Sequence, residues 1–159
     1  MRPKTLVPRR EVRDVDLAPL TPADERLVDQ AAAAAEDAFS PPEDGRFEHA
    51  AHIVTAAVET TSGAVYTAAS LPASVGRASN CAEPGALGAA VAAGDHEFER
   101  IVAVEHPRGD DADYRVIPPC GACRELLVDY GEDVRVVVRS EDGDTGVVRA
   151  ADLLPCRTW

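Results

Sequence analysis

The sequence predicts a three-layer α/β/α domain, in which helices cover both faces of a mixed five-stranded sheet. Segments with apolar residues at helical spacing alternate along the chain with short segments rich in valine, a pattern typical of strand–helix–strand units. Residues 134–139 form an apolar run of the kind found in buried parallel strands. The 159 residues, 45% of them hydrophobic, are enough for one domain with its own core and too few for two.

The N-terminal part of the chain is expected to divide into an arm and a first helix. Residues 1–20 carry mixed charge, several prolines and little periodicity, so we expect a flexible arm there and a single domain over residues 21–159. The sequence Thr-Pro-Ala-Asp at 21–24 is a typical helix start, and the two prolines at 41–42 end that helix. The predicted buried stripe consists of Leu27, Ala31, Ala34, Ala38 and Phe39.

A hairpin and two cysteine-bearing helices are expected next. Residues 53–60 and 64–70 are predicted strands, and Ser62-Gly63 between them favours a tight turn. The later predicted elements are a loop at 71–80, a helix from Cys81 to Gly94, a strand at 100–105, a polar loop at 107–113, a helix from Cys120, strands at 134–139 and 147–148, and a final helical turn reaching 153–154. Right-handed crossovers would place both cysteine-bearing helices on one face of the sheet, with their starts near its carboxyl edge.

The residues that carry chemistry stand at the starts of these two helices. Cys81 is followed by Ala82 and Glu83, and Cys120 and Cys123 occur in Pro-Cys-Gly-Ala-Cys. Three thiolates can fill three corners of a tetrahedral Zn²⁺ and leave the fourth for water, which distinguishes a catalytic zinc site from a structural one. We therefore predict that Cys81, Cys120 and Cys123 bind Zn²⁺ and that Glu83 is the catalytic acid and base. The Cys-x-x-Cys spacing alone would also fit a redox pair or two core cysteines.

The segments CAEPGALGAA (81–90) and PPCGACRELL (118–127) closely resemble the cytidine deaminase family, whose small all-cysteine branch also contains blasticidin S deaminases. The resemblance extends from about residue 50 to residue 155. It implies a cytidine deaminase-like fold and a zinc-dependent hydrolytic deaminase. Such an enzyme converts the exocyclic amine of a cytosine-like nucleoside, by family default cytidine or deoxycytidine, to a carbonyl and releases ammonia. It further implies pyrimidine salvage and a homotetramer with sites built at subunit contacts.

The same resemblance indicates where this chain departs from the family. The Asn-x-Glu-Asn segment that grips the ribose hydroxyls aligns with residues 70–73, where Ser70 and Pro72 replace the Asn and Glu. A free base or a blasticidin-like compound is therefore an alternative substrate. His52 aligns near a base-stacking phenylalanine, and Trp159 follows a C-terminal Leu-Leu-Pro that resembles blasticidin S deaminases; simple packing would also explain either residue. The predicted substrate contacts are His52, Ser70, Ala82 and Trp159.

Charge and hydropathy bear on the partners. Sixteen basic and twenty-eight acidic residues give a net charge of −12, which would repel phosphate backbones, so we expect a small-molecule substrate and no nucleic acid. The sequence shows no apolar stretch long enough for a membrane span and no secretion-like segment near Met1, so we expect a cytoplasmic protein. Two other readings stay open: a zinc-stabilised binding domain without turnover, and a thiol redox protein using Cys120 and Cys123.

Overall fold

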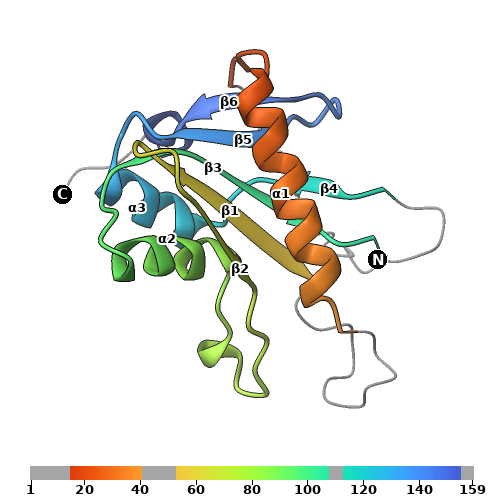
Figure 1. Cartoon of the computed structure of the whole chain (residues 1–159). Helices are drawn as coiled ribbons and strands as arrows, with labels where there is room; N and C mark the ends of the chain where they lie inside the picture. Colours follow the sequence, from red (N-terminus) through yellow and green to blue (C-terminus); the bar gives the residue numbers. More distant parts are fainter. Residues whose placement is uncertain (1–14, 41–52, 108–112, 155–159) are drawn as a thin grey trace.

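The computed structural model describes residues 15–40, 53–107 and 113–154. Within these ranges, six strands form one mixed sheet, with α1 across one face and α2 and α3 on the other (Figure 1). The predicted three-layer α/β fold is confirmed, with one strand more than expected. The elements are α1 (Pro22–Ala38), β1 (Val54–Thr60), β2 (Val65–Ala69), η2 (Gly76–Ala78), α2 (Ala82–Ala92), β3 (Phe98–Glu105), β4 (Arg115–Ile117), α3 (Gly121–Tyr130), β5 (Arg135–Arg139), β6 (Thr145–Arg149) and η3 (Ala150–Leu153).

The strand order explains why two distant segments of the chain meet. The order is β2-β1-β3-β5-β6, and β1 is antiparallel to both of its neighbours while β3 and β5 are parallel. Strands β2, β3 and β5 therefore run in one direction. The connections β2–α2–β3 and β3–α3–β5 are crossovers, so both helices start at the carboxyl ends of these strands, as predicted.

The additional strand lies in a region where no element was predicted. β4 pairs antiparallel with residues 103–105 of β3, while β5 pairs with residues 100–102. β4 thus covers the end of β3 that β5 does not reach. Its three residues are too few to show a period of two, so only the available edge of β3 makes this segment a strand.

The core has one apolar layer on each face of the sheet. On one side, Leu87 of α2 and Leu127 of α3 pack with Ile101 of β3. On the other side, Leu27 and Ala31 of α1 belong to a cluster with the valines of β3 and β5 that face α1. Because successive strand residues point to opposite faces, β3 contributes to both layers.

The buried stripe of α1 differs from the predicted one. The helix buries Asp24, Leu27, Ala31 and Ala35, whereas Ala34, Ala38 and Phe39 are only partly buried. The prediction followed apolar residues alone and therefore missed Asp24, whose carboxylate turns inward because cationic partners meet it on the sheet.

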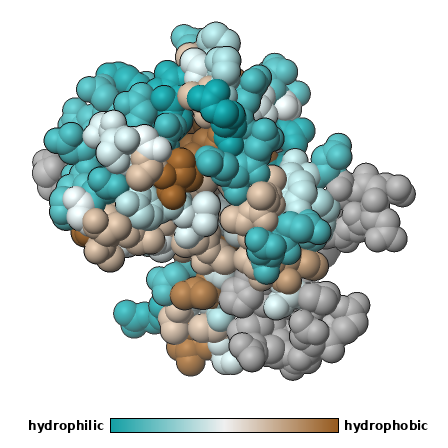
Figure 2. Space-filling model, in the orientation of Figure 1, coloured by the Kyte–Doolittle hydropathy of each residue, from teal (hydrophilic) through white to brown (hydrophobic). Residues whose placement is uncertain are grey.

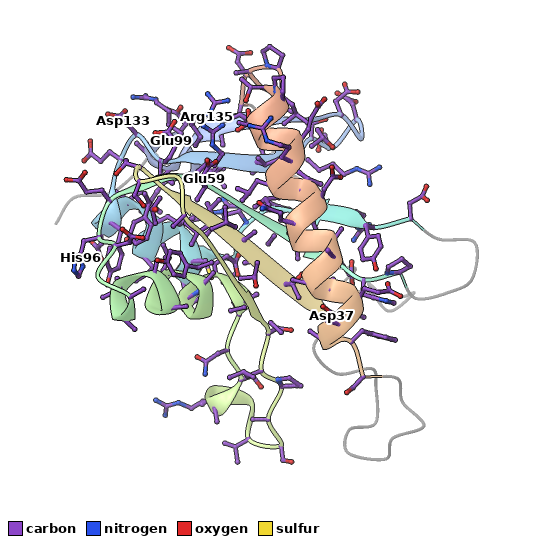
Figure 3. All side chains as sticks on the ribbon, in the orientation of Figure 1. Asp37, Glu59, His96, Glu99, Asp133 and Arg135 are labelled. Atoms are coloured by element: carbon purple, nitrogen blue, oxygen red, sulfur yellow. The ribbon has the colours of Figure 1, made fainter. Side chains whose placement is uncertain are left out.

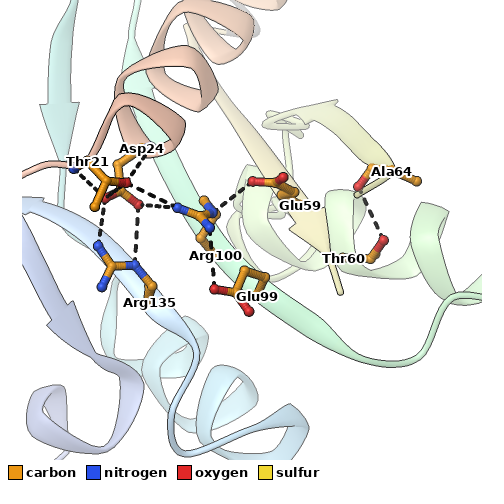
Figure 4. Close-up of polar contacts among 8 residues, drawn as sticks. All are labelled: Thr21, Asp24, Glu59, Thr60, Ala64, Glu99, Arg100 and Arg135. Carbon is orange, nitrogen blue, oxygen red and sulfur yellow. Dashed lines mark hydrogen bonds and ion pairs between the residues drawn. The ribbon is translucent and has the colours of Figure 1, made fainter. Parts of the chain in front are cut away.

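Asp24 ties the start of α1 to the sheet (Figure 4). Its carboxylate has no exposed surface and accepts hydrogen bonds from the Thr21 backbone N–H at 2.8 Å, from Arg100 at 2.9 Å and from Arg135 at 2.6 Å. Arg100 continues the network, since its Nε lies 2.7 Å from a carboxylate oxygen of Glu59. Figure 3 shows Glu59 and Arg135 grouped at this end of the sheet, where β1 ends and β3 begins. The charged cluster therefore lies at the opposite end of β3 from the connection that leads to β4.

Residues before α1 also contact the sheet. Ala18 and Val147 of β6 exchange two backbone hydrogen bonds of 2.9 and 2.8 Å. The nearby Gly146 has no room for a side chain, because a Cβ there would lie 2.7 Å from the Cβ of Leu17. Contact with the domain thus begins before residue 21, the predicted boundary. The remaining division into arm and domain stays a prediction, because residues 1–14 lie outside the described ranges.

None of the helices in the described ranges combines the length and apolar character that crossing a bilayer requires.

Candidate functional site

Three cysteine sulfurs lie together where α2 and α3 begin. Cys81 is the N-cap of α2, Cys120 is the N-cap of α3, and Cys123 lies in the first turn of α3. The Sγ atoms of Cys81 and Cys120 are 3.5 Å apart, and those of Cys120 and Cys123 are 3.6 Å apart. All three sulfurs lie within 4.8 Å of one another. The structure therefore brings together the three cysteines that the sequence singled out.

The spacing of these sulfurs matches a tetrahedral metal. Zinc–sulfur bonds of about 2.3 Å at tetrahedral angles place neighbouring sulfurs about 3.8 Å apart, close to the two distances found between the cysteine side chains. Among the described residues, the cluster of ligand-type groups contains these cysteines and no histidine or carboxylate. Three protein sulfurs on one ion would leave a fourth coordination position for another molecule.

The pKa values of the three thiols differ, and burial raises each of them. Burial by itself raises the pKa of Cys120, but hydrogen bonds from the backbone N–H of Cys123, from the thiols of Cys81 and Cys123 and from the backbone N–H of Ala122 together outweigh it and lower the pKa below its usual value. Burial, followed by the hydrogen bond with Cys120, raises the pKa of Cys81 to about 11. The pKa of Cys123 is also raised, first by burial and then by the negative charge of Glu83. A bound cation would favour the thiolate form of all three sulfurs.

Glu83 lies in the first turn of α2 beside these sulfurs. It is a largely buried glutamate, with 5% of its surface exposed. Burial raises the pKa of its carboxyl, against smaller opposing effects from its own backbone N–H and from Cys123. A carboxyl that binds a proton more readily than usual is suited to general acid and base chemistry near neutral pH.

A pocket of about 250 Å³ opens in front of Glu83 and two of the cysteines. It contains Ser70, one of the four predicted substrate contacts, whose backbone N–H donates to the carbonyl of Val54 at 2.7 Å. Ala82 does not reach this pocket, because its side chain is completely buried in the core beneath α2. The other two predicted substrate contacts, His52 and Trp159, lie outside the described residues.

Several pocket residues were not predicted. They are Val54, Ser79, Asn80, Ile117 and Pro118. Asn80 and Pro118 stand beside the cysteine motifs, and their positions in the sequence would have been a usable signal. Val54 and Ile117 carry no such signal, because strand pairing and side-chain alternation decide which way they face.

The loop between β2 and α2 forms one wall of the pocket. Leu71 and Asn80 close its ends through two backbone hydrogen bonds of 2.9 Å, which places Ser79 and Asn80 against the pocket. The middle of the loop projects from the body of the domain and carries Val75, which is 68% exposed. Figure 2 shows hydrophobic colour on this projection, below an otherwise mainly hydrophilic face.

Arg124 holds the segment before Cys120, which lies on another side of the pocket. Its Nε donates to the carbonyl of Pro119 at 3.0 Å, and its Nη1 donates to the carbonyl of Leu153 at 3.4 Å. These contacts fix the peptide before Cys120 against η3. The guanidinium therefore positions the start of α3.

Both the sequence and the fold of this chain are similar to those of known proteins. No family model matches the sequence. A blasticidin-S deaminase from Bacillus cereus is 44% identical over 94 residues, which cover 58% of this chain and 67% of that protein. A cytidine deaminase from Halalkalibacterium halodurans is 30% identical over 130 residues, or 81% of this chain and 89% of that protein.

Solved structures show the same relationship. A cytidine deaminase from Burkholderia pseudomallei superimposes with a TM-score of 0.65 and 33% identity, covering 87% of this chain and 100% of that chain. A cytidine deaminase from Bacillus anthracis has a TM-score of 0.66 at 19% identity, covering 84% of this chain and 87% of that chain, and this second similarity supports the fold alone.

Proposed function

The chain belongs to the cytidine deaminase family, and we propose that it is a zinc-dependent hydrolytic deaminase of a nucleoside-like amino-heterocycle. The observation that carries the proposal is the juxtaposition of three sulfurs with a buried carboxyl at the inner end of a pocket. A purely structural metal would have no use for Glu83 beside its open position. A thiol redox protein would not need the third sulfur of Cys81.

Cys81, Cys120 and Cys123 would hold the zinc ion, because their sulfurs already lie at distances that suit it. When bound, zinc acts as a Lewis acid that makes water acidic enough to supply a nucleophile near pH 7. The backbone N–H groups at the start of α3, which hydrogen-bond the sulfur of Cys120, help this site to hold negative charge.

Glu83 would move the protons of the reaction. Its place on the pocket wall lets it take a proton from the attacking water and pass one to the ring nitrogen of the substrate. A second proton would go to the departing amine. In balance, one water is consumed, a ring carbonyl replaces the exocyclic amine, and ammonia leaves. Burial raises the pKa of Glu83, which favours the protonated form needed for the donation steps.

Cytidine or deoxycytidine is the substrate that the family favours, and blasticidin S is the second candidate. Two observations favour the second: the 44% identity to a blasticidin-S deaminase, and the short hydroxyl of Ser70 at the position where the family resemblance places a sugar-binding residue. A site that lacks a hydrogen-bonding partner for the ribose hydroxyls discriminates less strongly for them. Contacts from His52 and Trp159 to the substrate remain part of the proposal.

The assembly and the cellular context also belong to the proposal. We expect a homotetramer in the cytoplasm that acts in pyrimidine salvage. Sedimentation of the zinc-loaded protein gives the assembly directly, and a monomer at all concentrations would contradict this part without affecting the chemistry.

Ammonia release by zinc-loaded protein tests the function. The panel consists of cytidine, deoxycytidine, cytosine and blasticidin S, with metal content measured on the same sample. We expect about one zinc per chain and turnover of at least one compound. Glu83→Gln should retain the metal and lose at least about a hundredfold in kcat, whereas Glu25→Gln, on the exposed surface of α1, should match the wild type. Full activity of the Glu83 variant would remove that residue from the mechanism. Zinc without turnover of any compound would favour a binding domain.

A further inference from the structure

Glu105 and Arg115 form an ion pair near the pocket, at the end of the sheet where β1 begins and β3 ends. Val54 is paired with Glu105 in the register of β1 and β3, and Glu105 is paired with Arg115 in the register of β3 and β4. Ser70 bonds to Val54 on the other side. The row Ser70, Val54, Glu105, Arg115 therefore crosses the sheet, and its first two members line the pocket. An Arg115 Nη2 lies 3.4 Å from an oxygen of Glu105, whose side chain is only 9% exposed.

Strand alternation shows that the pair faces the pocket side. Ala103 and Ile117 are paired two positions further along the same strands, and both pack in the core layer beneath α2 and α3. Residues two positions apart in a strand share a face, so Glu105 and Arg115 lie on that side as well. Facing residues of paired strands have Cβ atoms about 5 Å apart. Glu105 is thus separated from the pocket by the side chain of Val54, and Arg115 by that of Ile117.

The negative charge of the pocket makes the net charge of the Glu105–Arg115 pair relevant to substrate binding. If a divalent cation is bound as proposed, three thiolates would leave a formal charge of −1, and Glu83 adds a carboxyl to the same pocket. An anionic substituent on a substrate would be repelled unless a cation at the rim compensates. Arg115 is 39% exposed and is placed to compensate, but the Glu105 carboxylate beside it cancels its charge.

We propose that Glu105 is a specificity-determining residue, which neutralises Arg115 and so makes the pocket prefer uncharged nucleosides over nucleotides or other anionic analogues. This inference rests on the proposed function, because it needs a nucleoside-like ligand in the pocket. A single charge several ångströms from the ligand at a partly hydrated rim changes relative binding by roughly tenfold.

The test compares cytidine with cytidine 5′-monophosphate, which share one ring and differ in an anionic substituent. The measured quantity is the ratio of the two kcat/KM values. Glu105→Gln should raise the nucleotide-to-nucleoside ratio by about tenfold, because it leaves the charge of Arg115 uncompensated. Arg115→Gln should lower the ratio by a similar factor, and the double variant should return it close to the wild-type value. Glu25→Gln makes the same change in net charge away from the pocket and should leave the ratio unchanged.

The outcomes separate this inference from the proposed function. A ratio that stays within about twofold of the wild type in both single variants, while ammonia is released, overturns the role of Glu105 and leaves the deaminase intact. If Glu105→Gln fails to fold, the opposite shift expected for Arg115→Gln decides the question. If no variant releases ammonia, calorimetric binding of the same two compounds gives the ratio. Binding with the expected shifts supports the inference without the reaction. Absence of binding of both compounds overturns the inference and excludes cytidine as the substrate, and it leaves blasticidin S as the candidate substrate of the proposed deaminase.

Discussion

Replacing Asp24 with asparagine tests what holds α1 against the sheet. The buried carboxylate accepts hydrogen bonds from Thr21 and from the guanidinium groups of Arg100 and Arg135. Asparagine keeps the shape of the side chain but removes the charge, and its amide N–H₂ is directed at other donors. Glu59 and Glu99 still accompany Arg100 in the variant, so the main loss is the charged contact with Arg135.

The pKa of Asp24 sets the size of the effect. Burial alone would raise this pKa, but the hydrogen bonds from Arg135 and Thr21 outweigh it and lower the pKa from 3.8 to about 2. This lowering of the pKa, which already includes the hydrogen bonds from Thr21, corresponds to about 2 kcal/mol of stability. We therefore expect Asp24→Asn to lower the free energy of unfolding by about 2 kcal/mol. For a chain of this length, that change lowers the Tm by about 4–8 °C.

Urea unfolding at a series of pH values measures this contribution. Because the pKa of Asp24 is lower in the folded protein than in the unfolded chain, its stabilisation is complete above about pH 4 and is lost as the pH falls towards 2. The wild type should therefore be more stable than Asp24→Asn at neutral pH and approach it near pH 2. Parallel curves over this range, or a difference below about 0.5 kcal/mol at pH 7, would refute the assignment. Activity should be unchanged at temperatures where the variant is folded, because α1 and the pocket lie on opposite faces of the sheet.

Four further substitutions test the packing and the proposed metal centre. Gly85→Ala should lower the free energy of unfolding by about 1–2 kcal/mol, because its Cβ would lie 2.8 Å from that of Ala68. A Cβ at Gly88, on the same helix, would meet nothing within 4 Å. Gly88→Ala should therefore raise the free energy of unfolding by about 0.5–1 kcal/mol, measured by urea unfolding as for Gly85→Ala. Equal effects of the two substitutions would show that α2 approaches β2 less closely than described. Gly146→Val should displace the segment at Ala18 from β6, at a cost of about 1–3 kcal/mol, and an unchanged Tm would mean that this segment adds nothing. Cys123→Ala should lose the metal, so that added zinc no longer raises the Tm as it does in the wild type; a retained zinc response would exclude Cys123 as a ligand.

Local signals predicted most of the fold, and the exceptions share a cause. Turn residues predict the hairpin of β1 and β2. Residues typical of helix N-termini, followed by apolar residues at helical spacing, predict where α1, α2 and α3 begin. All of these signals lie within a few residues of one another. β4 and the inward direction of Asp24 depend instead on partners far along the chain, the edge of β3 and the side chain of Arg135. No window of the sequence contains both members of such a pair. Missing them is therefore a consequence of non-local pairing.

The residues of the site that belong to local sequence motifs were also predictable. The three cysteines and Glu83 are fixed by short motifs at helix starts, where the N-cap position determines the direction of the side chain. Ser70 was reached through the resemblance to the family. Ala82 has a side chain that is buried in the core, and its contact with the substrate stays a prediction. Val54 and Ile117 in the pocket wall come from strands, and a register shift of one residue would turn each of these two side chains away.

The sulfurs of the two cysteine motifs converge because both motifs belong to crossover connections that share the strand β3. Cys81 and Cys120 are 39 residues apart and contribute to the cluster from two crossovers that share this strand. The height of α2 above the sheet is set by the close approach of Gly85 to Ala68, and the start of α3 is fixed by Arg124. Each helix is thus positioned by contacts between protein groups. In the proposed function, a bound metal would offset the repulsion among the three thiolates at the edge of the pocket.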